Sequence, residues 1–130
     1  MIMRVWRGWT RVEDAAAYER YLLATGYTGY TSTGGNLGVC FTRRDVGERA
    51  EFLLTSLWES WEAIAAFAGD DPSRAVFYDE DDRFLVEREL TVTHHEVFAR
   101  RALIISAGNG REDRSPMDTE RWAVSVPRGY

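Results

Sequence analysis

The stretch that decides the fold is Leu57-Trp58-Glu59-Ser60-Trp61-Glu62-Ala63-Ile64-Ala65-Ala66-Phe67-Ala68-Gly69-Asp70-Asp71-Pro72. Ser60 is a typical helix N-cap and Gly69 a typical helix stop, so the residues between them predict a helix. Its inner stripe holds Trp61, Ile64, Phe67 and Ala68. After the stop, Asp71-Pro72 predicts that a short helix begins again and reaches about Phe77.

Outward from this stretch, the pattern predicts four strands and a second helix. Residues 2–9 read as a strand, and Thr10 with Glu13 forms a capping box that opens a helix ending near Thr25, before Gly26. A Gly/Thr/Ser loop is expected over residues 26–36. The remaining strands are predicted at Leu37–Arg44, Glu51–Glu59 and Val86–Phe98. The order β-α-β-β-α-β indicates an α+β, ferredoxin-like fold with an antiparallel sheet.

Residues 1–98 hold all of these elements and are predicted to form one domain. The chain continues to residue 130. Residues 99–130 are interpreted as a C-terminal extension, either an arm that packs or is exchanged between subunits, or a mobile tail.

The third predicted strand is apolar on both faces, because Phe52, Leu54 and Trp58 alternate with Leu53 and Leu57. A sheet covered on one face only has polar residues on the other. We therefore expect a second copy of the chain to cover the other face.

Composition excludes several functions. The net charge of −5 argues against a nucleic-acid partner, which requires a basic surface. All 16 basic residues are Arg, so no Lys nucleophile or Schiff base is available. The single cysteine, Cys40, excludes an internal disulfide and is expected to be buried in a strand. No apolar run has the length of a membrane span and the N-terminus has no signal-peptide pattern, so the expected location is the cytoplasm, away from membranes.

The sequence resembles the antibiotic biosynthesis monooxygenase-like family, within the dimeric α/β-barrel superfamily. The resemblance covers residues 2–98 and is carried by Arg4-Val5-Trp6-Arg7-Gly8-Trp9-Thr10, the Leu57-to-Asp71 run, Arg74-Ala75-Val76, Asp81-Asp82-Arg83-Phe84-Leu85 and Val92-Thr93-His94-His95-Glu96-Val97. It implies a homodimer whose sheets pack together, with a pocket between each sheet and its helices.

Haem-degrading members of this superfamily have a Trp where this sequence has Phe67, and a haem-ligating His near the position of Phe77. Because both are absent here, the resemblance predicts that the protein does not degrade haem by that mechanism.

Two candidate catalytic residues lie on strands. His94 and His95 are adjacent and point to opposite faces of a strand, so they do not chelate one metal together. A general base and a simple structural hydrogen bond are both open roles for these histidines. If one of them is functional, the resemblance favours His94, as the base. Arg4 shares a strand face with Trp6, and Gly8 leaves room beside them; Arg4 either stabilises a substrate anion or pairs with an acid such as Glu19 or Glu96.

Glu19 falls in the middle of the apolar stripe of the first helix. A carboxylate there must be paired, neutralised or facing a cavity. Pairing with an Arg of the first strand and an acid/base role both remain open, and Glu19 is the third catalytic candidate.

The expected substrate-binding residues are aromatic, and the alternative for each is a place in the core: Trp6, Trp58, Trp61, Phe67, Tyr78 and Phe84. Asp79-Glu80-Asp81-Asp82 is interpreted as an exposed acidic corner. The first functional hypothesis is a cofactor-independent monooxygenase-like protein that acts on a small aromatic or enolisable compound. In it His94 is the base, Arg4 stabilises the anion, and no cofactor or metal is used. The alternative is a non-catalytic dimeric protein that binds a small molecule.

Overall fold

The computed structural model describes residues 1–101. Contacts divide the chain into two units, Met1–Phe98 and Ala99–Tyr130, and the fold described below is that of the first. The expectations for the C-terminal extension as arm or tail fall almost entirely outside the described residues.

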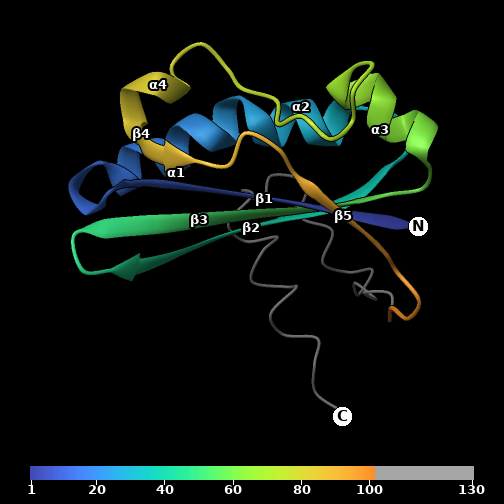
Figure 1. The fold of residues 1–130 in the computed structure, drawn as a ribbon, viewed down its shortest axis with the longest axis horizontal. Coiled ribbons are helices and arrows are strands. Elements are labelled where there is room, and N and C mark those ends of the chain that lie inside the picture. Colours follow the sequence, from blue (N-terminus) through green and yellow to red (C-terminus); the bar gives the residue numbers. More distant parts are fainter. Residues whose placement is uncertain (102–130) are drawn as a thin grey trace, which may run out of the picture. The chain divides into compact units, whose positions relative to one another are not determined.

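The first unit is an antiparallel sheet with its helices on one face (Figure 1). The strands are β1 (Ile2–Arg11), β2 (Asn36–Val46), β3 (Arg49–Trp58), β4 (Leu85–Arg88) and β5 (Thr93–Glu96). Their order is β2-β3-β1-β4, and β5 pairs with β1 as well. The fold is α+β with the predicted ferredoxin-like order, since β4 and β5 together take the place of the fourth strand.

The fourth strand is interrupted, which corrects the prediction of one strand over Val86–Phe98. β4 pairs with residues 8–10 of β1, and β5 pairs with residues 2–5. Between them the backbone of Glu89 still donates to the Arg7 carbonyl, but Leu90 and Val92 bond instead to a segment that lies over the sheet. The interruption therefore supplies backbone groups that hold this segment.

The first predicted helix begins later than expected, and a further helix follows it. A 3-10 turn, η1 (Val12–Asp14), leads into α1 (Ala15–Ala24), and α2 (Gly26–Ser32) follows. The predicted capping box of Thr10 and Glu13 does not form, because Thr10 belongs to β1 and its hydroxyl donates to the Arg11 carbonyl.

The loop predicted over residues 26–36 is also wrong over most of its length, because α2 occupies it. Tyr27 and Tyr30 of this helix pack against Phe41, with ring centroids 6.0 and 5.5 Å away. This tertiary packing overrides the low helix propensity of its Gly and Thr residues.

The next helix, α3 (Trp61–Ala68), has the predicted ends. The Ser60 hydroxyl accepts a hydrogen bond from the Ala63 amide at 3.1 Å, and Gly69 ends the helix with a φ of 91°. The short helix predicted from Pro72 to Phe77 is wrong. Asp71 instead accepts hydrogen bonds from the amide and hydroxyl of Ser73, which forms a local turn. The next helix is α4 (Asp81–Phe84).

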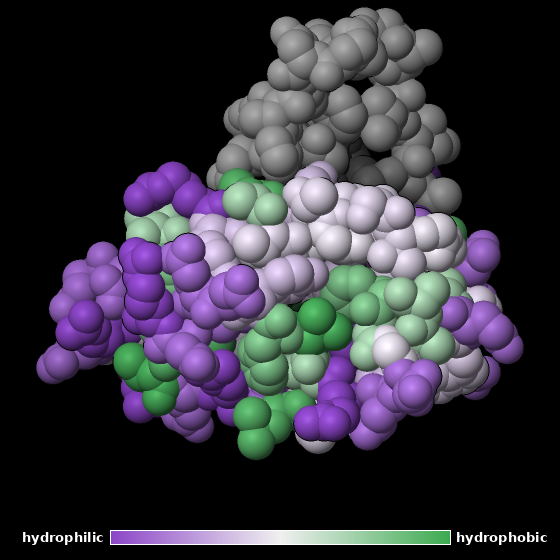
Figure 2. Space-filling model, turned by 90° about the horizontal axis from the view of Figure 1, so that it is seen from above, coloured by the Kyte–Doolittle hydropathy of each residue, from purple (hydrophilic) through white to green (hydrophobic). Residues whose placement is uncertain are grey.

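Alternation along β1 and β3 divides the side chains between two faces. The helix-side face contains the core, in which Trp6, Phe52 and Trp58 are buried. Figure 2 shows the helix-covered side, with hydrophobic residues in the middle and hydrophilic ones towards both ends. The opposite face carries half-buried apolar side chains, among them Met3, Val5, Leu53 and Leu57. Cys40 is exposed, which corrects the expectation of a buried thiol. Within residues 1–101, no helix is both long and apolar enough to span a membrane.

Candidate functional site

Residues 72–78, here called the covering segment, lie over the helix side of the sheet. The Ala75 amide donates to the Leu90 carbonyl at 3.0 Å, and the Val92 amide donates to the Ser73 carbonyl at 2.9 Å. The interrupted fourth strand thus holds the middle of the segment. Its two ends are held by charged side chains, Arg4 and Asp81.

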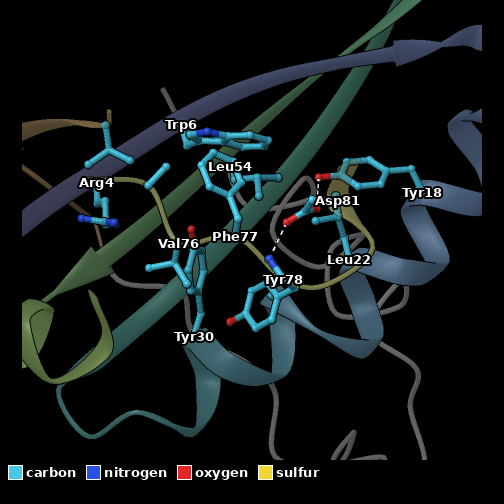
Figure 3. A pocket seen from close by; sticks show the side chains of 13 residues that line it. Arg4, Trp6, Tyr18, Leu22, Tyr30, Leu54, Val76, Phe77, Tyr78 and Asp81 are labelled. Carbon is cyan, nitrogen blue, oxygen red and sulfur yellow. Dashed lines mark hydrogen bonds between the residues drawn. The ribbon is translucent and has the colours of Figure 1, made fainter. Parts of the chain in front are cut away.

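A cavity lies beneath the covering segment, between β1, β3, α1 and α2 (Figure 3). Its volume is about 20 Å³, which is room for one water molecule. Five of its lining residues are aromatic: Trp6, Tyr18, Tyr30, Phe77 and Tyr78. A molecule larger than water therefore requires these rings or the covering segment to move.

Arg4 lies at one end of this cavity and is only 1% exposed. Its Nη1 donates to the Pro72 carbonyl at 2.5 Å and lies 3.1 Å from His94 Nε2, and its Nη2 donates to the Arg74 carbonyl at 2.9 Å. The buried Nε has no hydrogen-bond partner. Among residues 1–101 no carboxylate forms an ion pair with Arg4, so the predicted pairing with Glu19 or Glu96 is wrong.

Among the described residues, the groups that balance the charge of Arg4 are therefore dipoles and one aromatic face. Its guanidinium lies 5.8 Å from the centroid of the Phe67 ring, and burial lowers its pKa while Tyr30 partly opposes that shift. Removing an ion from water costs several kcal/mol, and a carbonyl recovers less of this than an anion does. An anionic group beside Arg4 would complete the site.

His94, on β5 opposite Arg4, contacts that residue but does not line the cavity. Because a guanidinium has only donors, Nε2 of His94 accepts and the ring proton lies on Nδ1. Burial, followed by the charge of Arg4, lowers the pKa of His94. The imidazole is thus neutral near pH 7, as a base must be, but its basic nitrogen is already in use.

Asp81 is a functional candidate that the sequence interpretation missed. It was expected in an exposed corner, yet it is 4% exposed and lines the cavity. The Tyr18 hydroxyl donates to its Oδ1 at 2.9 Å, and the Tyr78 amide donates to its Oδ2 at 2.6 Å. The three neighbouring acidic residues made this run typical of an exposed turn. The one sequence signal of burial is that Asp81 lies three residues before the apolar Phe84.

This fold occurs among solved structures. The chain is similar to a variant of MhuD crystallised with two manganese protoporphyrin IX molecules per active site, with 19% identity and a TM-score of 0.50 over 78% of this chain and 99% of that one. It is also similar to a candidate antibiotic biosynthesis monooxygenase from Bacillus cereus, with 13% identity and a TM-score of 0.48 over 80% of this chain and 96% of that one. The expected resemblance is confirmed for the fold. No protein-family model and no curated protein matches the chain.

The predicted aromatic residues separate into two groups. Trp6 and Tyr78 line the cavity, and the Trp6 indole donates to the Glu89 carbonyl at 2.7 Å. The other four do not line it. Trp58 and Phe84 are core residues, Phe67 packs on Tyr30 with centroids 4.4 Å apart, and Trp61 is 51% exposed and touches the His94 ring. The core alternative is therefore correct for Trp58 and Phe84.

Glu19 lies away from the cavity, so its catalytic role is not supported by the geometry. Its carboxylate accepts from Arg43 of β2 at 2.8 Å, and its side chain is 43% exposed. The inward stripe of α1 is Ala15, Tyr18 and Leu22. The large Tyr18 takes the position over the sheet and leaves Glu19 at the edge of the helix.

Within the described part of the chain, no group of three His, Cys, Asp or Glu side chains is placed to hold a metal ion. The site consists of a buried cation, a buried carboxylate and aromatic walls.

Proposed function

We propose that the protein is a monooxygenase-like enzyme that binds a small aromatic or enolisable compound as its anion, with no cofactor. The observation that carries this proposal is Arg4, a buried cation with an unpartnered Nε at the end of an aromatic-walled cavity. Such a group lowers the free energy of an enolate or phenolate oxygen beside it, because few water molecules screen the charge.

In this chemistry a base removes a proton from an electron-rich ring carbon, and the anion reacts directly with O₂. One oxygen atom ends on that carbon as a carbonyl, and the other leaves as water with both hydrogens of the carbon. Arg4 holds the negative oxygen, and the Trp6 and Phe77 rings exclude solvent. If a carbonyl or hydroxyl oxygen of the substrate accepts from Arg4 Nη1 before deprotonation, the lone pair of His94 Nε2 becomes available as the base that generates the anion.

The test is oxygen consumption with a panel of anthrones, quinols, flavonoids and enolisable phenols. Arg4→Ala and His94→Ala should each lower the rate by at least tenfold while the far-ultraviolet circular dichroism stays unchanged. Glu19→Ala, at a residue remote from the cavity, is the control and should keep the rate within twofold. Full oxygen consumption in folded Arg4→Ala protein would exclude this mechanism.

A second candidate function is non-catalytic binding of the same class of small molecule. It is favoured by the contact of His94 Nε2 with Arg4 and by the position of His94 outside the cavity lining. Quenching of tryptophan fluorescence separates the two functions, because Trp6 lines the cavity. Saturable quenching without consumption of ligand or O₂ supports binding alone, and no quenching by any compound of the panel contradicts both functions.

Haem belongs in the panel because the MhuD variant binds manganese protoporphyrin IX. We expect no haem degradation. Phe67 packs on Tyr30 and Trp58, and Phe77 fills part of the cavity, so neither position supplies an indole or an imidazole. Release of a linear tetrapyrrole product from haem and a reductant would contradict this expectation.

We also propose that two copies pair through the sheet face opposite the helices. The half-buried Met3, Val5, Leu53 and Leu57 lie on neighbouring strands there, since β1 and β3 are paired. Burying an apolar side chain contributes roughly 1.5–3 kcal/mol, so a self-complementary patch of this kind favours association.

A further inference from the structure

The cavity has a second charged end, formed by Asp81. In Figure 3 the Arg4 guanidinium and the Asp81 carboxylate lie at opposite ends of the pocket, with Trp6, Phe77 and Tyr30 between them. Asp81 comes from the first turn of α4, whereas Arg4 comes from β1. The two charges do not neutralise each other through an ion pair.

Asp81 has acceptor positions that the protein leaves open. A carboxylate accepts at about four lone-pair positions. The Tyr18 hydroxyl and the Tyr78 amide take one on each oxygen. The exposed Asp82, rather than Asp81, forms the ion pair with Arg88. Burial raises the pKa of Asp81, and the bonds from Tyr78 and Tyr18, followed by the nearby charge of Arg88, oppose that shift.

A purely structural role would not require this residue to be an acid. An uncharged Asn or Ser could accept the Tyr78 amide bond that fixes the end of the covering segment, without the desolvation cost of a carboxylate. A ligand that donates a hydrogen bond to Asp81 would offset that cost. A ligand without a donor would leave the remaining acceptor positions of the carboxylate desolvated and unfilled, which costs more than the missing bond itself.

We infer that the pocket selects aromatic anions carrying a hydroxyl or amino group at the end away from the negative oxygen, with Asp81 as the specificity-determining acceptor. This inference rests on the proposed function and narrows its substrate class. Arg4 takes the anionic oxygen, the rings between the charges contact both faces of the aromatic system, and Asp81 takes the distal donor. The covering segment moves to admit the ligand, because the cavity holds only about 20 Å³.

The test compares three aromatic acids that differ at one position. The first series is 4-hydroxybenzoate, 4-methoxybenzoate and benzoate, and the second is the corresponding set of 6-substituted 2-naphthoates, which covers a longer ligand. Dissociation constants are measured by calorimetry on the full chain. We expect one hydroxy acid to bind at least tenfold more tightly than both its methoxy and its unsubstituted partner.

Asp81→Asn should reduce that preference to less than threefold while the unsubstituted acid keeps its affinity. The matched control is Asp82→Asn, which changes the adjacent, 87%-exposed carboxylate and should keep the full preference. The ratio between two ligands reports specificity, which a general loss of packing would not change selectively.

Each outcome has a distinct meaning. Binding of all three acids with equal affinity would overturn the role of Asp81 and leave the anion site at Arg4 intact. Failure of every acid to bind would overturn the proposed function and this inference with it. If Asp81→Asn does not fold, the comparison of the three acids on the unmodified protein still decides the inference.

Discussion

The Trp6 ring occupies the space that a side chain at position 8 would take, and Gly8 leaves this space free. A Cβ at this position would be 2.3 Å from Trp6 Cη2 and 3.1 Å from Leu85 Cδ2. The ring cannot easily turn away, because its Nε1 is bonded to the Glu89 carbonyl. The close pairing of a glycine and a tryptophan thus shapes one wall of the cavity.

We therefore predict that Gly8→Ala lowers the free energy of unfolding by about 1–3 kcal/mol, the usual cost of overpacking a core. Gly34→Ala is the control, since a Cβ there meets no atom within 4 Å, and it should change stability by less than about 0.5 kcal/mol. Urea unfolding measures both. Equal stability of the two variants would contradict the role given to the Trp6 contact.

His94 gives the protein a pH-dependent stability of known sign. Its pKa is lower in the folded state, through burial and the charges of Arg4 and His95, than the value of 6.5 expected for the unfolded chain. Below pH 6.5 the unfolded chain binds more protons at this residue, so stability falls as the pH decreases from 6.5 through the folded pKa. Above about pH 7.5 both states are neutral and the contribution is constant.

We predict that His94→Gln loses less stability than the unmodified protein between pH 7.5 and pH 5.5, because a Gln oxygen can accept from Arg4 without titrating. His95→Gln is the control for removing an adjacent imidazole. The measurement is urea unfolding at both pH values. An identical pH dependence in His94→Gln and the unmodified protein would contradict the stated shift.

At the scale of single residues, the sequence predicted one end of the site and missed the other. Arg4 and Trp6 could be placed together because they alternate along an unambiguous strand. Asp81 could not, because its burial depends on Tyr18 of α1, which is 63 positions away, and on the turn at Tyr78. The local polarity of the sequence predicts the exposure of the neighbours of Asp81 correctly, but it predicts the exposure of Asp81 itself wrongly.

Among the elements, α2 has a glycine at the point where Tyr78 of the covering segment approaches its backbone. A Cβ on Gly29 would lie 2.4 Å from the Tyr78 hydroxyl oxygen and 3.5 Å from Phe67 Cε1. The glycine therefore admits the end of Tyr78 next to the helix backbone. Since that hydroxyl ends a rotatable side chain, an added methyl would displace Tyr78 rather than the helix.

We predict that Gly29→Ala changes the free energy of unfolding by less than about 1 kcal/mol, because the gain in helix propensity offsets the displacement of Tyr78. Its affinity for the aromatic acid that the unmodified protein binds best should change at least threefold, since Tyr78 lines the cavity. Calorimetry and urea unfolding measure the two effects. An unchanged dissociation constant would show that Tyr78 does not contact the ligand.

The strands could be predicted better than the segments between them. Ser60, Gly69 and the alternation of β3 act locally, so they indicated structure correctly. α2 was not predictable from its Gly and Thr residues, because it is held by distant aromatic contacts to Phe41 and Phe67. The predicted helix after Pro72 fails because the backbone there bonds to the interrupted fourth strand and to Arg4.

For the whole molecule, the proposed pairing of two copies has a direct test. We predict a dimer of about 30 kDa by light scattering at micromolar concentration, twice the 14.9 kDa of the chain. Leu53→Glu places a charge on the proposed interface and should give a monomer. Leu90→Glu, at a side chain 69% exposed outside the strands, makes the same chemical change and should keep the dimer. A stable monomer of the unmodified protein would contradict the proposal.

Arg4 binds the carbonyls of Pro72 and Arg74, so one guanidinium serves both the cavity and its cover. In the proposed function, a ligand anion that takes these donors would release the covering segment by the same step, and a closed segment would withhold the donors from the ligand. The affinity for the anion and the opening of residues 72–78 are therefore coupled, because each changes the free energy of the other by the same amount. In the proposed function, a substitution outside the cavity lining that loosens residues 72–78 changes how tightly an anion binds, although it touches no ligand atom.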